Sequence, residues 1–144
     1  MNFNNHFKFL PKLGTAIYYL VFVLGMLLLF FGRNLEGIRF SILETNFTDF
    51  YQHISNLSLT AILFSTVAYV WLLMGVKLRA ILLLGIFFIA INSITETWVS
   101  VLNTRDPLDL VYGIVGVLIG LVFILSITYL KGLTANPNFT SKTD

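Results

Sequence analysis

The sequence contains no cysteine and only two histidines in 144 residues. Without cysteine, the chain has neither a disulfide framework nor a thiolate nucleophile. Neither histidine belongs to the His-x-x-x-His or Glu-x-x-His spacings of common zinc and di-iron sites, so no metal and no other cofactor is expected. No glycine-rich phosphate loop follows a strand, and no basic patch indicates a nucleic-acid partner.

Charged residues are also scarce. They make up 11% of the chain, against about 25% in soluble domains, whereas hydrophobic residues make up 57%. Uncharged runs cover residues 13–32, 54–76, 80–95 and 110–130. A membrane-spanning helix needs roughly 17 to 25 such residues, a length that the third run reaches if its helix continues through Glu96. The sequence therefore predicts an all-α fold, a four-helix transmembrane bundle with the lipid bilayer as its partner.

The segments outside these runs are short or polar. Between the first two runs, apolar residues such as Ile42, Leu43 and Phe47 recur at near-helical spacing, which predicts a short helix in the membrane interface. Residues 1–131 are expected to form one four-helix membrane domain. Residues 132–144 are rich in Asn, Ser and Thr and are predicted to be a disordered cytoplasmic tail.

Basic residues are distributed unevenly between the two ends of the predicted bundle. The side that holds both termini carries Lys8, Lys12, Lys77, Arg79, Lys131 and Lys142, and the opposite side carries Arg33, Arg39 and Arg105. The positive-inside rule therefore predicts cytoplasmic termini. Every acidic residue except Asp144 falls on the opposite half. Polar chemistry is consequently expected on the outer face.

The start of the fourth run combines helix-capping residues with a row of glycines. Pro107 fits the first helical turn, Asp106 fits the N-cap, and Asp109 follows three residues after the cap. Further along the same face, at four, seven and eleven residues beyond Asp109, are Gly113, Gly116 and Gly120. Such glycines allow a neighbouring helix to approach closely, so Asp109 is predicted to point into the bundle. Capping and packing alone would also account for these residues.

Glu96 is the acidic residue nearest to the apolar interior. A carboxylate at mid-membrane costs about 2.5 to 3.5 kcal/mol, and such residues usually face a partner or a cavity. Polar residues repeat along its helix at three- and four-residue spacing, namely Asn92, Glu96, Ser100 and Asn103. The stripe favours a site inside the bundle, although a position at the interface beside Trp98 would also explain Glu96.

Asp49 and His53 stand four residues apart at the start of the second helix. On a helix they share one face, where the carboxylate and the imidazole can hydrogen-bond. The expected topology brings this helix start close to Glu96 and Asp109, because all three lie at the outer end. Three separate polar features therefore converge on one place.

The order and spacing of these residues resemble the VanZ-like membrane proteins. The resemblance covers roughly residues 45–125 and rests on Asp49, His53, Glu96, Arg105, Asp109, Gly113, Gly116 and Gly120. It implies a bacterial protein of the cytoplasmic membrane, linked to the cell envelope and to resistance to glycopeptide antibiotics such as teicoplanin. The chain departs from the family pattern at Phe50, Val99 and Gly113, where a lysine, a glutamine and an asparagine are usual.

Three hypotheses follow for the cluster of Asp49, His53, Glu96, Arg105 and Asp109. In the first, the cluster binds an envelope or glycopeptide-related ligand, with Arg105 paired to Glu96 or Asp109. In the second, the protein is a membrane enzyme acting on a lipid-linked envelope substrate, with His53 as general base and Glu96 as general acid. In the third, the charges form a structural clasp between helix ends. The three departures remove polar groups, which favours binding over catalysis.

Overall fold

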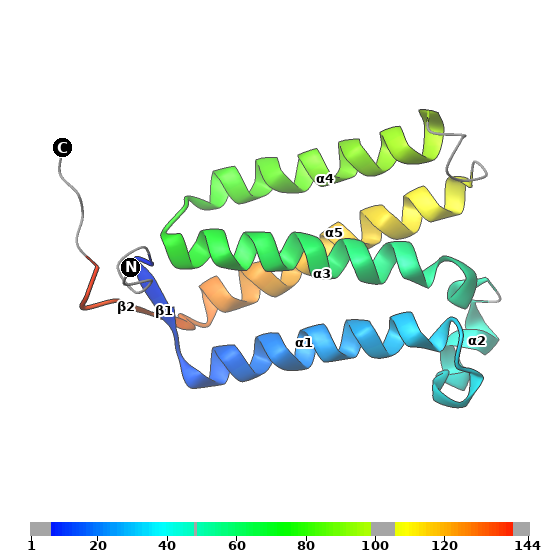
Figure 1. The fold of residues 1–144 in the computed structure, drawn as a ribbon, viewed down its shortest axis with the longest axis horizontal. Coiled ribbons are helices and arrows are strands. Elements are labelled where there is room, and N and C mark those ends of the chain that lie inside the picture. Colours follow the sequence, from blue (N-terminus) through cyan, green and yellow to red (C-terminus); the bar gives the residue numbers. More distant parts are fainter. Residues whose placement is uncertain (1–6, 48, 99–105, 140–144) are drawn as a thin grey trace.

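The computed structural model describes residues 7–47, 49–98 and 106–139. Four long helices make up the body of the molecule (Figure 1): α1 Leu13–Gly32, α3 Phe50–Met74, α4 Leu78–Trp98 and α5 Pro107–Tyr129. Each is long and apolar enough to cross a membrane. The predicted all-α fold, a four-helix transmembrane bundle, is confirmed.

A short helical segment connects α1 to α3. It consists of the 3-10 turn η2 (Glu36–Ile38) and the helix α2 (Ser41–Asn46), in the region where the sequence predicts an interfacial helix. Arg39 holds the segment in place, because its Nε donates to the carbonyl of Gly32 at 2.8 Å and its guanidinium pairs with Glu44 at 3.2 Å. These contacts fix the segment to the end of α1.

Helices α3 and α5 form the centre of the bundle, flanked by α4 on one side and α1 on the other (Figure 1). The buried residues of α3 recur at helical spacing and include Ile54, Leu57, Ala61, Phe64 and Ala68. A Cβ atom added at Gly116 of α5 would collide with the backbone oxygen of Leu57. The glycine therefore lets the two backbones touch.

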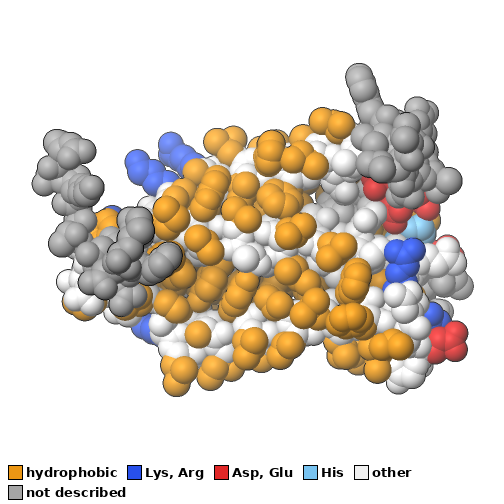
Figure 2. Space-filling view, viewed as in Figure 1, with side chains coloured by type: hydrophobic (Ala, Val, Ile, Leu, Met, Phe, Trp, Pro, Cys, Tyr) orange, Lys and Arg blue, Asp and Glu red, His pale blue; other side chains and the backbone are white. Residues whose placement is uncertain are grey.

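Large apolar side chains cover the outside of the helices. Figure 2 shows them across the length of the bundle, and they include Leu20 and Val21 of α1, Leu83 and Ile86 of α4, and Val122 of α5. In water such a surface would drive aggregation, whereas in lipid it is the expected covering. Charged side chains lie at the two ends (Figure 2).

Two segments near the ends of the described chain pair in a small antiparallel β-ladder that the sequence did not predict. Strand β2 (Leu133–Ala135) pairs with β1 (Phe9–Pro11), and both lie at the end of the bundle opposite α2 (Figure 1). The side chain of Asn136 is buried and donates to the carbonyl of Phe7 at 2.7 Å. The expected disorder from residue 132 therefore does not extend through Leu133–Ala135. Composition indicated a tail because Asn, Ser and Thr are polar, but here a polar side chain fixes the strand.

Candidate functional site

His53 lies in the first turn of α3 and faces the start of α5. Only 6% of the residue is exposed. Its Nδ1 lies 2.9 Å from Oδ1 of Asp109 and 3.7 Å from Oδ2 of Asp106. The imidazole ring packs against Tyr112, with 5.4 Å between ring centroids. A buried imidazole is therefore held between two carboxylates of another helix, and we call these three residues the His–Asp–Asp cluster.

The local sequence of α5 explains how both carboxylates reach the imidazole. Asp106 is the N-cap, and its Oδ1 accepts a hydrogen bond from the backbone N–H of Leu108 at 2.9 Å. Its other oxygen stays free to face His53. Asp109 lies three residues later on the same face of the helix, and its side chain is 17% exposed. The N-cap role that the sequence predicted for Asp106 is confirmed, but the same residue also belongs to the site.

Glu96 supplies a third carboxylate from α4. Its Oε1 lies 3.5 Å from the amide nitrogen of Asn56, at the limit of a hydrogen bond. Its Oε2 is buried and has no hydrogen-bond partner within the described residues. The charge of Glu96 interacts repulsively with those of Asp109 and Asp106. We call the His–Asp–Asp cluster together with Glu96 and Asn56 the polar site.

Asn92 joins α4 to α5 just below the polar site. Its side-chain amide donates to the carbonyl of Leu110 at 3.4 Å. A Cβ atom at Gly113 would collide with this amide. Gly113 therefore provides room for Asn92, whereas Gly116 and Gly120 face α3, where added Cβ atoms would meet Leu57 and Phe64.

One of the predicted site residues, Asp49, does not join the cluster. Asp49 is exposed at the start of α3, and its side chain makes no capping hydrogen bond. The imidazole of His53 points to Asp109 instead of to Asp49, so the expected Asp49–His53 pair is replaced by one between helices. Arg105 lies outside the described residues, as do Ser100 and Asn103 of the polar stripe, so the pairing of Arg105 stays a prediction.

The polar site has an excess of negative charge within the part of the chain that the structure describes. There, the guanidinium of Arg39 pairs with Glu36 and Glu44, and no Lys or Arg side chain forms a salt bridge with Glu96, Asp106 or Asp109. The acidic side chains and the histidine gather at one end of the molecule (Figure 2). The N-termini of α3 and α5 meet at the same end, and their dipoles favour carboxylates there.

An apolar groove of about 300 Å³ adjoins the polar site. It runs between α3 and α5 and is lined by Phe47, Phe50, Leu57, Val111, Tyr112 and Val115. The ring of Tyr112 contacts His53 on one side and lies 6.0 Å from the ring of Phe50 in the groove. Polar site and groove therefore share a wall, and sequence periodicity gives no sign of this groove.

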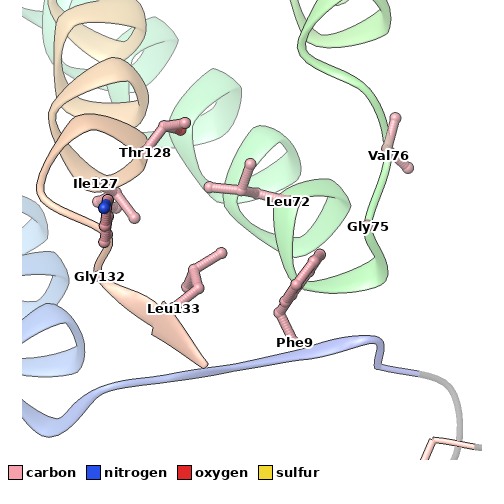
Figure 3. Close-up of a pocket in the computed structure, with 9 residues that line it drawn as sticks. Phe9, Leu72, Gly75, Val76, Ile127, Thr128, Gly132 and Leu133 are labelled. Carbon is pink, nitrogen blue, oxygen red and sulfur yellow. The ribbon is translucent and has the colours of Figure 1, made fainter. Parts of the chain in front are cut away.

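A second cavity, of about 410 Å³, lies at the opposite end. Figure 3 shows its lining, in which Phe9 of β1 and Leu133 of β2 approach Leu72 of α3 and Ile127 of α5. Except for Thr128 and Lys131, these side chains are apolar, and the lining contains no carboxylate, histidine or cysteine. The chemically versatile side chains lie at the other end, both at the polar site and around a further cavity lined by Arg33, Asn34, Arg39, Glu44, Tyr51 and Gln52.

Comparisons with known proteins leave the family open. The resemblance to the VanZ-like proteins rests on the residues of the chain itself, for the following reason. No protein-family model, no curated protein and no solved structure matches this sequence.

Proposed function

We propose that this chain is a VanZ-like protein of the bacterial cytoplasmic membrane that binds a lipid-linked ligand of the cell envelope. The polar site takes the headgroup and the groove beside it takes the first part of the apolar chain. One observation carries the proposal: Tyr112 forms a wall of both the polar site and the groove. An amphiphilic ligand needs such a junction, whereas a small water-soluble ligand does not.

Charge distribution supports an outward-facing site. The end with both termini carries the basic residues Lys8, Lys12, Lys77, Arg79 and Lys131, whereas the other end carries Arg33 and Arg39 among the described residues. By the positive-inside rule the termini are cytoplasmic. The polar site then opens towards the outer leaflet, where envelope ligands are displayed.

An enzymatic role is the alternative, and the 2.9 Å contact between His53 and Asp109 favours it. A carboxylate hydrogen-bonded to Nδ1 can orient an imidazole as a general base. However, a general base must reach its substrate, and 94% of His53 is already covered. Binding is therefore the better-supported function.

Binding of a lipid-linked ligand is testable with a polyprenyl phosphate added to the purified protein in detergent. Native mass spectrometry should detect one bound molecule, in preference to phosphatidylglycerol. Val115→Trp fills the groove and should weaken binding about tenfold, which corresponds to 1.4 kcal/mol. Val122→Trp, two turns further along the lipid-facing surface of α5, is the matched control and should leave binding unchanged. Equal binding by both variants, or no preference over phosphatidylglycerol, would refute the proposal.

A further inference from the structure

The ligand atoms of the His–Asp–Asp cluster have the spacing of a metal site. One nitrogen or oxygen atom from each of His53, Asp106 and Asp109 lies within 4.8 Å of the other two. The two measured separations from Nδ1 are 2.9 and 3.7 Å. Bonds of about 2.0 to 2.2 Å to one central ion place its ligand atoms roughly 3 to 4.4 Å apart. Small side-chain movements therefore close the three residues around a cation.

The charge balance of the site also favours a cation. Among the described residues, Asp106 and Asp109 contact one imidazole and Glu96 lies near both, while the helix dipoles at the starts of α3 and α5 supply only about half a positive charge each. Glu96 contributes an oxygen that is buried and has no hydrogen bond within the described residues. Carboxylates this close repel one another, and a divalent cation would offset that repulsion.

The ligands are already oriented by their surroundings. The hydrogen bond from the backbone N–H of Leu108 fixes the carboxylate of Asp106, and Tyr112 packs against the imidazole of His53. Such outer contacts hold metal ligands in position in known sites. The ligands come from two helices, which is why no short motif in the sequence indicates them.

We propose that His53, Asp106 and Asp109 bind one divalent cation of the Mn²⁺ or Zn²⁺ class. One imidazole nitrogen with carboxylate oxygens suits these ions better than Mg²⁺, which prefers oxygen alone. Binding through Nδ1 requires a free lone pair there, so a proton on that nitrogen moves to Nε2 if the imidazole is neutral, or to water if it is an imidazolium. Three protein ligands leave further coordination positions open.

The cation also explains how an acidic site could bind a phosphorylated headgroup. This step rests on the proposed function. Lipid-linked envelope ligands commonly carry phosphate, which three carboxylates would repel. A divalent ion held by the cluster provides a positive centre whose open positions accept phosphate oxygens. The ion thus makes an acidic site selective for a phosphorylated lipid.

The test is a metal titration of the protein, purified without a histidine tag and stripped with a chelator. MnCl₂ followed by electron paramagnetic resonance, and ZnCl₂ followed by calorimetry, should each give one ion per chain. Asp106→Asn retains a good N-cap and Asp109→Asn retains the size of the side chain, so both variants should fold. Each should weaken ion binding at least about tenfold, the lower bound for disturbing a metal site. Asp49→Asn, at the same end of the bundle but outside the cluster, should bind as the parent protein does.

The outcomes separate this inference from the proposed function. Binding of less than one ion, or equal affinities in parent and Asp109→Asn proteins, overturns the metal site. If the polyprenyl phosphate binds equally with and without chelator, the ion-bridged headgroup is wrong and the lipid site stands. If the ion binds and the lipid does not, the metal site stands and the proposed function fails.

Discussion

The two ends of the bundle are closed by different means. At the end with the termini, backbone groups and neutral side chains make the closing contacts. Strand β1 pairs with β2, and Thr15 donates to the carbonyl of Gly132 at 2.7 Å. At the other end, Asp106 and Asp109 at the start of α5 contact His53 of α3, and Glu96 of α4 lies near both carboxylates. The first end shows that this chain can join helix ends without burying charge. The charges at the second end are therefore not needed for closure.

This contrast weighs against the structural clasp. A clasp should pair every charge, yet Oε2 of Glu96 is buried without a hydrogen bond in the described structure, and the carboxylates of Asp106 and Asp109 share one imidazole. Buried ion pairs seldom stabilise a fold more than apolar packing would. An arrangement that costs stability at one end, when the other end avoids the cost, is typical of a binding site.

The largest effect tests which end faces the cytoplasm. Because the chain has no cysteine, single cysteines can be placed at Asn46, beside the polar end, and at Thr134, in β2. In intact cells an impermeant thiol reagent should label the first and not the second. Labelling of both after membrane permeabilisation is the control, and the reverse pattern in intact cells would place the polar site in the cytoplasm.

The next largest effect is expected from a substitution that tests the close contact between α3 and α5, the two helices that join both ends. Gly116→Leu places a side chain against the backbone oxygen of Leu57, which cannot move aside as a side chain would. We expect loss of most folded protein, measured by fluorescence-detected size-exclusion chromatography. Gly25→Leu is the control, since nothing lies within 4 Å of a Cβ atom there. Similar yields for both variants would contradict the close contact of α3 and α5.

A smaller effect compares two acidic residues at the polar end. Asp109→Ala leaves His53 buried without its 2.9 Å partner and should lower stability by about 1 to 3 kcal/mol. Glu96→Gln removes a repulsive charge and should leave stability equal or slightly higher. Thermal unfolding in detergent measures both changes. A clasp predicts the opposite for Glu96, with a clear loss of stability.

The smallest effect concerns the end with the termini. Thr15→Val removes the hydrogen bond to Gly132 and leaves a buried carbonyl without that donor, at a cost of about 1 kcal/mol. Thermal unfolding should register this loss, while metal and lipid binding at the far end should be unchanged. A change in binding of tenfold or more would mean that the two ends are coupled.

The fold was largely predictable, because bilayer thickness sets helix length and apolar runs of that length are visible in the sequence. The start of α5 was predictable as well, since Asp106 and Pro107 form a local capping pattern. Patterns of neighbouring residues did not predict the contacts between segments that are distant in the sequence. The ladder between β1 and β2 and the hydrogen bond from Asn136 to Phe7 join distant segments, which no periodicity indicates.

The site was predicted only in part, because its contacts also join segments that are distant in the sequence. Asp49 and His53 stand at a spacing that suggests a pair, but the imidazole turns away from its own helix towards Asp109. That direction depends on how closely α3 and α5 approach at Gly116, which is a property of packing. Asp106 was assigned only a capping role, because its second oxygen gains its partner only when the two helices pack.

The close contact between α3 and α5 has a consequence for how the protein responds to its membrane. Helices whose backbones touch at Gly116 and pack tightly at Gly120 cannot slide or tilt independently, whereas α1 and α4 expose broad surfaces to lipid. A thinner or thicker bilayer is then accommodated by tilting of the outer helices. His53 and Asp109 lie on the two rigidly joined helices, so their separation should stay constant between membranes of different hydrophobic thickness.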